Sequence, residues 1–149
     1  MTTDPAVFAA VFVALFVAHQ VADHWVQTDH QAAHKGRPGW AGRRACAAHV
    51  FSYTVTAFAA ATAVHFALGL EIDGWRLFAG LTVSAVTHYI ADRRTPLKRL
   101  AELIGISRFY ALGAPRPGRD DNPSIGTGAY ALDQSFHHAW LAVAALIIA

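Results

Sequence analysis

Four apolar stretches alternate with polar connections along the chain. They are Pro5–Gln27, Ala45–Leu70, Gly74–Asp92 and Ala131–Ala149. A hydrocarbon core of about 30 Å takes roughly 20 helical residues to cross, and each stretch is close to that length. Pro5 suits a first helical turn, and Asp73-Gly74 separates the second stretch from the third. The pattern predicts an all-α fold, a four-transmembrane-helix bundle that forms a single integral-membrane domain over residues 1–149.

A fifth segment, Pro96–Ile106, has a different pattern. Leucine and isoleucine recur on one helical face, while Lys98, Arg99 and Glu102 occupy the other. This predicts a short amphipathic interfacial helix between helices 3 and 4 of the bundle. The Gly- and Pro-rich segment 113–130 that follows is too irregular for a helix. It is either a loose connection or a lid over a site, since long loops are commonly one or the other.

Composition favours a membrane protein, with 54% hydrophobic and 15% charged residues and a mean hydropathy of +0.30. Because the apolar stretches are rich in alanine, which contributes little to membrane insertion, a soluble four-helix bundle with a histidine-rich core remains an alternative. The segment before the first stretch, MTTDP, lacks positive charge. We therefore expect this stretch to remain in the mature protein rather than to be cleaved as a signal peptide.

The basic residues lie in two of the three connections. Lys35, Arg37, Arg43 and Arg44 lie between or near the first two stretches, and a larger basic set lies between the last two, whereas the short turn after Leu70 holds only Arg76. By the positive-inside rule both basic loops face the cytoplasm and both termini lie outside. The sequence pI is near 9, but no stacking-aromatic pattern accompanies the charges, so we expect no nucleic-acid partner.

Histidine and aspartate recur at the predicted cytoplasmic ends of the four helices. Three pairs have i, i+4 spacing, which places both side chains on one helix face. These pairs are His19 with Asp23, His88 with Asp92, and Asp133 with His137, and His49 adds a fourth helix. The topology was assigned from Lys and Arg, so the convergence of His and Asp in one half of the membrane is independent of it.

An aspartate near the middle of a membrane helix costs roughly 2.5 to 3.5 kcal/mol, so these carboxylates need compensation. A divalent metal ion would supply it, with zinc first and manganese, iron or nickel as alternatives, as one ion or two. The predicted metal ligands are His19, Asp23, His49, His88, Asp92 and His137. Asp133 is a ligand or a general base, and Gln27 and Gln134 orient water or substrate. Two metal-free alternatives are His–Asp hydrogen bonds that join helices and a proton relay.

A metal at the cytoplasmic boundary can activate water and polarise a phosphoryl or acyl oxygen, which favours a hydrolase. The expected substrate is lipid-linked or phosphate-bearing, with membrane lipid as the surrounding partner, and homo-oligomer formation is compatible with the pattern. A metal-ion or proton transporter that uses the same His/Asp groups is one alternative function. A structural membrane subunit is another.

Four segments carry a resemblance: AHQVADHWVQT, ACAAHV, THYIADRRTPLK and ALDQSFHHAW. Together they resemble a bacterial integral-membrane family, number 3307 of the domains of unknown function. The resemblance implies a location in the bacterial inner membrane and helices that bear histidine and aspartate. The chain is more loosely similar to membrane-bound metal-dependent hydrolases, and that analogy favours hydrolysis without assigning any residue a role.

Overall fold

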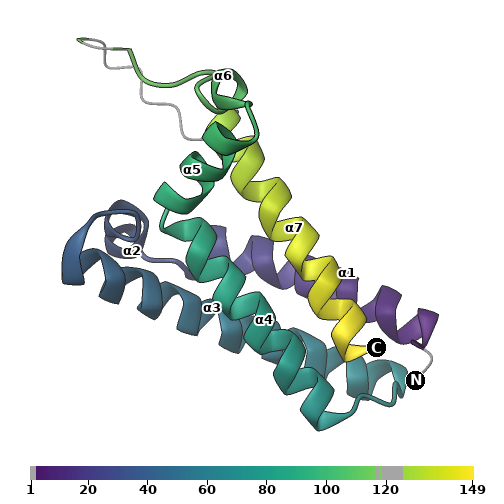
Figure 1. The fold of residues 1–149 in the computed structure, drawn as a ribbon. Helices are drawn as coiled ribbons and strands as arrows, with labels where there is room; N and C mark the ends of the chain where they lie inside the picture. Colours follow the sequence, from purple (N-terminus) through teal and green to yellow (C-terminus); the bar gives the residue numbers. More distant parts are fainter. Residues whose placement is uncertain (1–2, 117, 119–125) are drawn as a thin grey trace.

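The computed structural model describes residues 3–116, 118 and 126–149, and every regular element in this part of the chain is helical. The elements are α1 (Pro5–Val21), the π-helix η1 (Ala22–Val26), α2 (Asp29–His34), α3 (Gly39–Leu68), α4 (Gly74–Asp92), α5 (Thr95–Leu103), α6 (Ser107–Tyr110) and α7 (Gly128–Ile148). Figure 1 shows their arrangement. The all-α prediction is confirmed.

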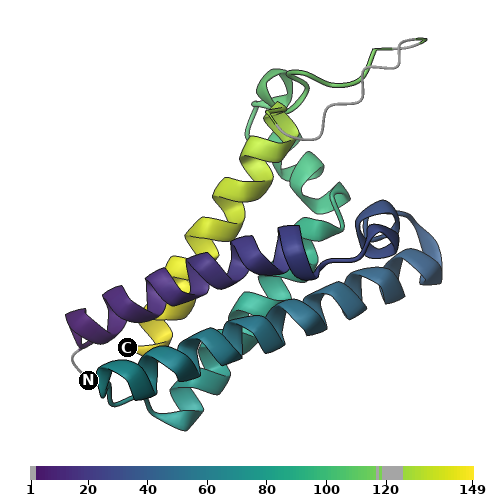
Figure 2. The same cartoon turned by 180° about the vertical axis from the view of Figure 1, so that it is seen from behind.

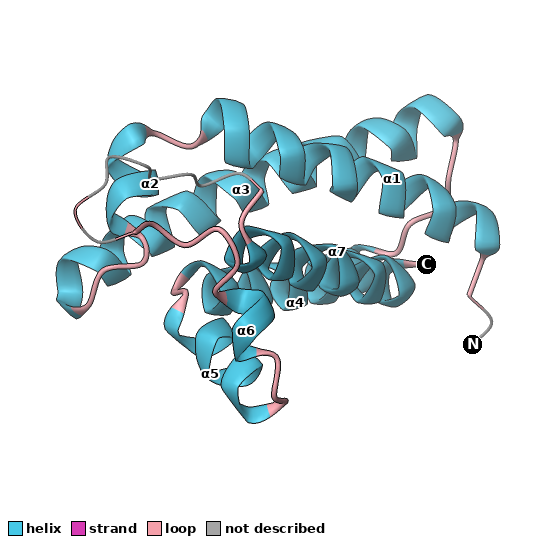
Figure 3. Ribbon diagram, turned by 90° about the horizontal axis from the view of Figure 1, so that it is seen from above, coloured by secondary structure: helices cyan, strands magenta, loops and turns pink. Residues whose placement is uncertain are grey.

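Four long helices form a ring in which each packs against two neighbours. α1 contacts α3 and α7, and α4 contacts the same two helices. The ring therefore runs α1, α3, α4, α7, and consecutive members are antiparallel (Figures 1 and 2). Both termini lie at one end, where the Asp4 backbone N–H donates to the Ala149 carbonyl over 3.3 Å. α5 and α6 project from the other end, as the view from above also shows (Figure 3).

Local sequence accounts for the helix ends. The carboxylate of Asp4 caps α1 by accepting from the Ala6 and Val7 backbone N–H groups, and Asp73 and Thr127 cap α4 and α7 in the same way. α3 stops at Gly69, whose φ of 64° is the left-handed conformation that glycine adopts without strain. These side-chain caps mark where α1, α4 and α7 start, whereas α3 begins after Pro38 without one.

The end of the bundle nearest the termini has an apolar core. Its buried residues include Val7, Val11, Leu15, Ala57, Leu81, Leu141, Ala144 and Ile148. The small residues Ala57 and Ala144 are fully buried, which lets the helices approach closely. Polar side chains are concentrated in the other half, so the bundle has one dry end and one polar end.

Several boundaries differ from the sequence prediction. α3 begins at Gly39 rather than Ala45, because the polar turn around Arg43 is helical as well. The short helix α2 was not predicted; it begins at a capping box between Thr28 and Gln31. The amphipathic helix is present as α5, close to the predicted Pro96–Ile106. Of the segment 113–130 to which the lid alternative applies, residues 117 and 119–125 lie outside the described residues, and residues 128–130 form the first turn of α7.

Among the described residues, two helical segments are long and apolar enough to cross a membrane by length and composition, Pro5–Val26 and Gly39–Leu68, and α4 and α7 are not among them. The two segments correspond to the first two predicted spans. α4 and α7 are formed where the third and fourth spans were predicted, with 19 and 21 residues.

The contact between α4 and α7 depends on Gly80. A Cβ added to Gly80 would lie 2.5 Å from the Ile148 side chain and 2.8 Å from the Ala144 carbonyl oxygen, whereas one added to Gly74 on the same helix meets nothing within 4 Å. We expect Gly80→Ala to lower the free energy of unfolding by roughly 1–3 kcal/mol through overpacking. Gly74→Ala is the matched control and should leave it nearly unchanged. Thermal unfolding in detergent, followed by circular dichroism, measures both, and equal stabilities would contradict this packing.

Candidate metal centre

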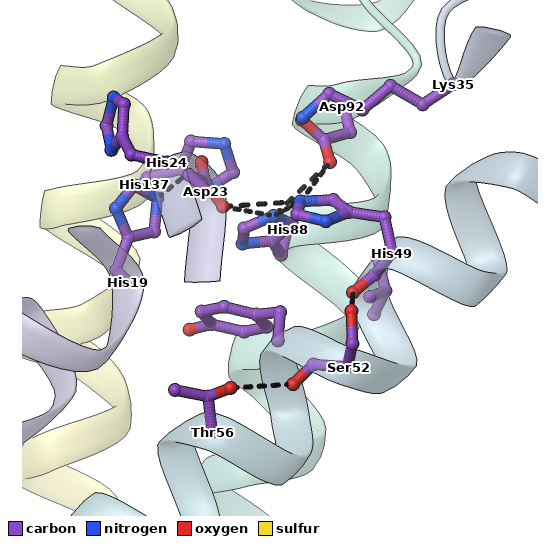
Figure 4. A network of polar contacts seen from close by, with 12 residues as sticks. His19, Asp23, His24, Lys35, His49, Ser52, Thr56, His88, Asp92 and His137 are labelled. Atoms are coloured by element: carbon purple, nitrogen blue, oxygen red, sulfur yellow. Dashed lines mark hydrogen bonds and ion pairs between the residues drawn. The ribbon is translucent and has the colours of Figure 1, made fainter. Parts of the chain in front are cut away.

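The structure brings the six predicted ligands together in the polar half of the bundle. His19 comes from α1, Asp23 from η1, His49 from α3, His88 and Asp92 from α4, and His137 from α7. We call these six residues the His/Asp cluster. Figure 4 shows their side chains pointing toward one another from different helices. All are nearly inaccessible to solvent, Asp23 being the most exposed at 9% of its side chain.

The centre of the cluster is a pair of imidazoles flanked by two carboxylates. Nε2 of His49 and Nε2 of His88 lie 3.1 Å apart. Oδ1 of Asp23 lies 3.2 Å from the His49 nitrogen and 3.6 Å from that of His88. Oδ2 of Asp92 lies 3.3 Å from each. The four atoms therefore form two triangles that share the His49–His88 edge.

His19 and His137 lie on the α1–α7 side of this centre. Nε2 of His19 is 3.5 Å from Oδ2 of Asp23, and the His137 ring lies 4.2 Å from the His88 ring between centroids. Nε2 of His137 is in turn 3.7 Å from Oδ2 of Asp133, whose side chain is 26% exposed. Asp133 thus connects the buried cluster to the outside of the bundle.

Many polar atoms of the cluster lack a hydrogen bond. Nε2 of His19, Oδ1 of Asp23, Oδ2 of Asp92 and Nε2 of His137 are buried and have no partner with hydrogen-bond geometry. They approach other polar atoms within 3.2 to 3.7 Å but are not aligned for donation. An unsatisfied buried polar atom costs about 1–3 kcal/mol, so several in one place call for an explanation. A cation bound among these nitrogen and oxygen atoms would satisfy them.

The π-helix η1 positions Asp23. The Gln27 backbone N–H donates to the Ala22 carbonyl over 2.9 Å, five residues back instead of four. A π-turn holds an extra residue, and such turns are frequent at functional sites. From this turn the Asp23 carboxylate approaches both His19 on α1 and His49 on α3. The sequence analysis treated this segment as regular α-helix.

Lys35 is a cluster partner that the sequence analysis missed. Its Nζ lies 2.8 Å from Oδ1 of Asp92, and the side chain is only 11% exposed. The Arg93 guanidinium donates to the Lys35 and Arg37 carbonyls over 2.5 and 2.6 Å, which ties the end of α2 to the end of α4. Lys35 was interpreted only as a loop charge that sets topology, because nothing in the sequence relates it to Asp92.

Tyr53 separates the cluster from the apolar end of the bundle. Its ring is stacked on that of His88, with 4.0 Å between centroids, and its hydroxyl is hydrogen-bonded to Ser84 over 2.5 Å. Tyr53 is 1% exposed. Its position within an apolar stretch gave no sign of this contact.

The two predicted glutamines lie in different surroundings. Nε2 of Gln134 donates to Oδ2 of Asp133 over 3.4 Å. Nε2 of Gln27 is buried without a hydrogen-bond partner. A third glutamine, Gln20, places its amide nitrogen 3.5 Å from Nδ1 of His19 and 3.4 Å from Nε2 of His138. Gln20 was not among the predicted residues, although it is adjacent to His19 in the sequence.

The fold and the cluster together define a class of protein, a four-helix bundle with buried histidine and aspartate side chains converging from every long helix. Within that class the chain belongs to the family described as protein of unknown function (DUF3307), whose model matches residues 11–149. This match confirms the resemblance to family 3307 inferred from the four motif segments. No curated protein and no solved structure gives a significant match.

The Lys35–Asp92 pair should contribute strongly to stability in chelator-treated protein. Lys35→Met leaves the Asp92 carboxylate buried without its ammonium partner, and breaking a buried pair in this way costs roughly 3–5 kcal/mol. The double variant Lys35→Met/Asp92→Asn should lose less free energy of unfolding than Lys35→Met and Asp92→Asn lose together as single variants. The reason is that the double variant leaves no buried unpaired charge. Unfolding of detergent-solubilised protein, monitored by circular dichroism, gives the three values.

Lys98→Met provides the control for this cycle. Lys98 is exposed on α5, so its substitution should change the free energy of unfolding by no more than about 0.5 kcal/mol. Additivity of the Lys35 and Asp92 effects would show that the two side chains do not interact energetically.

Proposed function

We propose that this protein is a membrane-embedded, metal-dependent hydrolase whose four long helices all cross the bacterial inner membrane. Each helix presents large apolar side chains outward, including α4 and α7. Examples are Val13 on α1 at 59% exposed, Phe51 on α3 at 72%, Phe78 on α4 at 63% and Leu146 on α7 at 50%. Apolar surface of this extent on every side of a bundle favours a lipid environment. With the basic connections cytoplasmic, the His/Asp cluster lies toward the inner leaflet and both termini lie outside.

The observation that carries the metal proposal is the spacing of the central ligand atoms. A tetrahedral zinc ion with bonds of about 2.0–2.1 Å separates its ligand atoms by about 3.3–3.4 Å. The two triangles on the His49–His88 edge have sides between 3.1 and 3.6 Å. Three protein ligands and an open fourth position are typical of catalytic zinc sites. Either carboxylate, Asp23 or Asp92, can complete such a set with the two imidazoles.

Mixed imidazole and carboxylate ligands suit zinc, and also manganese, iron or nickel. Among the described residues, three groups drawn from the cluster and Asp133 have ligand atoms mutually within 4.8 Å, and the first group shares His88 with the second and His137 with the third. The groups are His19–His88–His137, Asp23–His49–His88 and Asp92–Asp133–His137. Such sharing is compatible with one ion or two adjacent ions.

The chemistry follows from the open position and from Asp133. A divalent ion held by these side chains would supply the means to activate water and to polarise the oxygen under attack. Asp133, at the solvent-facing edge, would act as general base, and Gln134 holds its Oδ2 by a hydrogen bond. Gln27 has an unused buried amide nitrogen with which to orient water or substrate. The substrate would be lipid-linked or phosphate-bearing, since the cluster lies at the interface end of the bundle.

The apolar half of the bundle argues against the transporter alternative. A carrier must connect its site to both faces of the membrane. Among the described residues, the core between the cluster and the termini consists of apolar side chains such as Val11, Leu15 and Leu141. Tyr53 closes the cluster on that side. We therefore favour an enzyme that is open toward one face only.

Metal content tests the centre directly. Detergent-purified protein should bind close to one or two equivalents of zinc, manganese, iron or nickel, measured by elemental analysis after equilibration and desalting. His88→Ala should weaken binding by more than about tenfold, because even an outer-shell partner of a metal ligand is worth 10–100-fold. His65→Ala is the control, since His65 lies on the distal part of α3. Wild-type protein that stays folded but takes up none of these metals would favour the structural-subunit alternative.

Turnover tests the assignment of Asp133. Metal-loaded protein in mixed micelles should hydrolyse phosphatidic acid or phosphatidylglycerol, with the released phosphate or glycerol phosphate measured over time. Asp133→Asn should keep the metal but lower turnover by roughly 10²–10⁴-fold, the usual contribution of a general base. Wild-type rates in Asp133→Asn, or undiminished rates after metal removal, would contradict the mechanism.

A further inference from the structure

A basic groove of about 640 Å³ lies between the start of α3, the end of α4 and α5. Three arginines line it, Arg43, Arg93 and Arg99, together with the apolar surfaces of Tyr89, Leu100 and Leu103. None of the described residues that line it is acidic. The groove therefore presents positive charge without an internal counter-ion. Two of its lining residues, Tyr89 and Arg93, directly follow the cluster residues His88 and Asp92 in the sequence.

Two of the arginines are held in place by contacts that leave donors available. Arg93 uses one N–H of each terminal nitrogen on the Lys35 and Arg37 carbonyls. The Arg43 guanidinium lies over the Trp40 ring, 5.3 Å from its centroid. A guanidinium carries five N–H donors, so both retain donors for a further acceptor. Fixed guanidinium groups with unused donors suit phosphate recognition.

A second, apolar groove of about 190 Å³ lies on the other side of α5. Its lining includes Leu97 of α5, Ile104 directly after α5, and Leu132 and Phe136 of α7. α5 thus separates the basic groove from the apolar groove, and Leu100 lines both.

We propose that the paired grooves bind one anionic phospholipid, with its phosphate against Arg43, Arg93 and Arg99 and an acyl chain along Leu97, Ile104 and Phe136. The joint arrangement requires an amphiphile with a negative head, which free phosphate or a neutral lipid does not match. Basic pockets next to membrane helices are known to hold such head groups. The proposal rests on the proposed function in one respect, because it names an anionic phospholipid as the substrate class delivered to the His/Asp cluster.

Adjacent basic residues provide matched variants for the test. Arg43 and Arg99 line the groove, whereas their neighbours Arg44 and Lys98 are exposed outside it. The double variants Arg43→Gln/Arg99→Gln and Arg44→Gln/Lys98→Gln remove the same net charge. Binding of each to fluorescent phosphatidylglycerol is measured in nonionic detergent micelles, with phosphatidylcholine as the neutral reference and excess inorganic phosphate as competitor.

The groove variant should bind phosphatidylglycerol at least tenfold more weakly than wild type, while the control variant stays within about twofold. Wild type should prefer phosphatidylglycerol to phosphatidylcholine and should retain it in excess inorganic phosphate. Equal weakening of the two variants, no preference between the lipids, or full displacement by phosphate would each overturn the proposal.

The same measurements separate this proposal from that of the metal centre. Metal content is determined for both double variants, and lipid binding is measured for His88→Ala. Lipid binding that persists in a folded, metal-free His88→Ala protein supports the groove independently of the metal. If the protein binds metal but shows no preference for the anionic lipid, the lipid-binding proposal is wrong and the metal-centre proposal is unaffected.

Discussion

Charge balance around Asp92 is the constraint on which the polar half of the bundle depends. One of its oxygens pairs with the Lys35 ammonium, and the other faces the imidazoles of His49 and His88. A carboxylate this deeply buried is tolerated only with partners on both sides. Because Lys35 follows the last residue of α2, the pair holds α2 against the bundle, and Arg93 reinforces that contact through the Lys35 carbonyl. One buried charge thus fixes the position of a segment that no apolar stretch would have placed.

The apolar pattern was sufficient to predict the helices, because each long helix has a nearly continuous apolar sequence with recognisable caps at Asp4, Asp73 and Thr127. It could not predict helix structure in polar sequence. α2 and the first turns of α3 contain basic and small residues, and their helicity depends on a capping box and on contacts between α2 and α3. The π-turn at η1 was also beyond prediction, since its i, i+5 hydrogen bond has no sequence signature of its own.

The site was predictable where its geometry lies within one helix. His88 and Asp92 are one helical turn apart, so their proximity of 3.3 Å follows from spacing alone. The contact of Lys35 with Asp92 spans 57 positions and depends on how α2 folds back, which spacing does not determine. Tyr53 was missed for a related reason, because an aromatic residue in an apolar stretch gives no indication of which neighbour it will stack on.

The uneven distribution of polarity along the bundle has a chemical consequence. Between Tyr53 and the termini the core is apolar and rich in alanine, which excludes water and lets the helices approach closely. The opposite half of the bundle holds the His/Asp cluster, the partly exposed Asp133 and the arginine-lined groove. A charge in the cluster therefore interacts through a poorly screened interior on one side and reaches solvent on the other. Electrostatic effects on a charge held in the cluster are strong under such conditions, and the proposed hydrolase would take up its substrate from the polar end of the bundle.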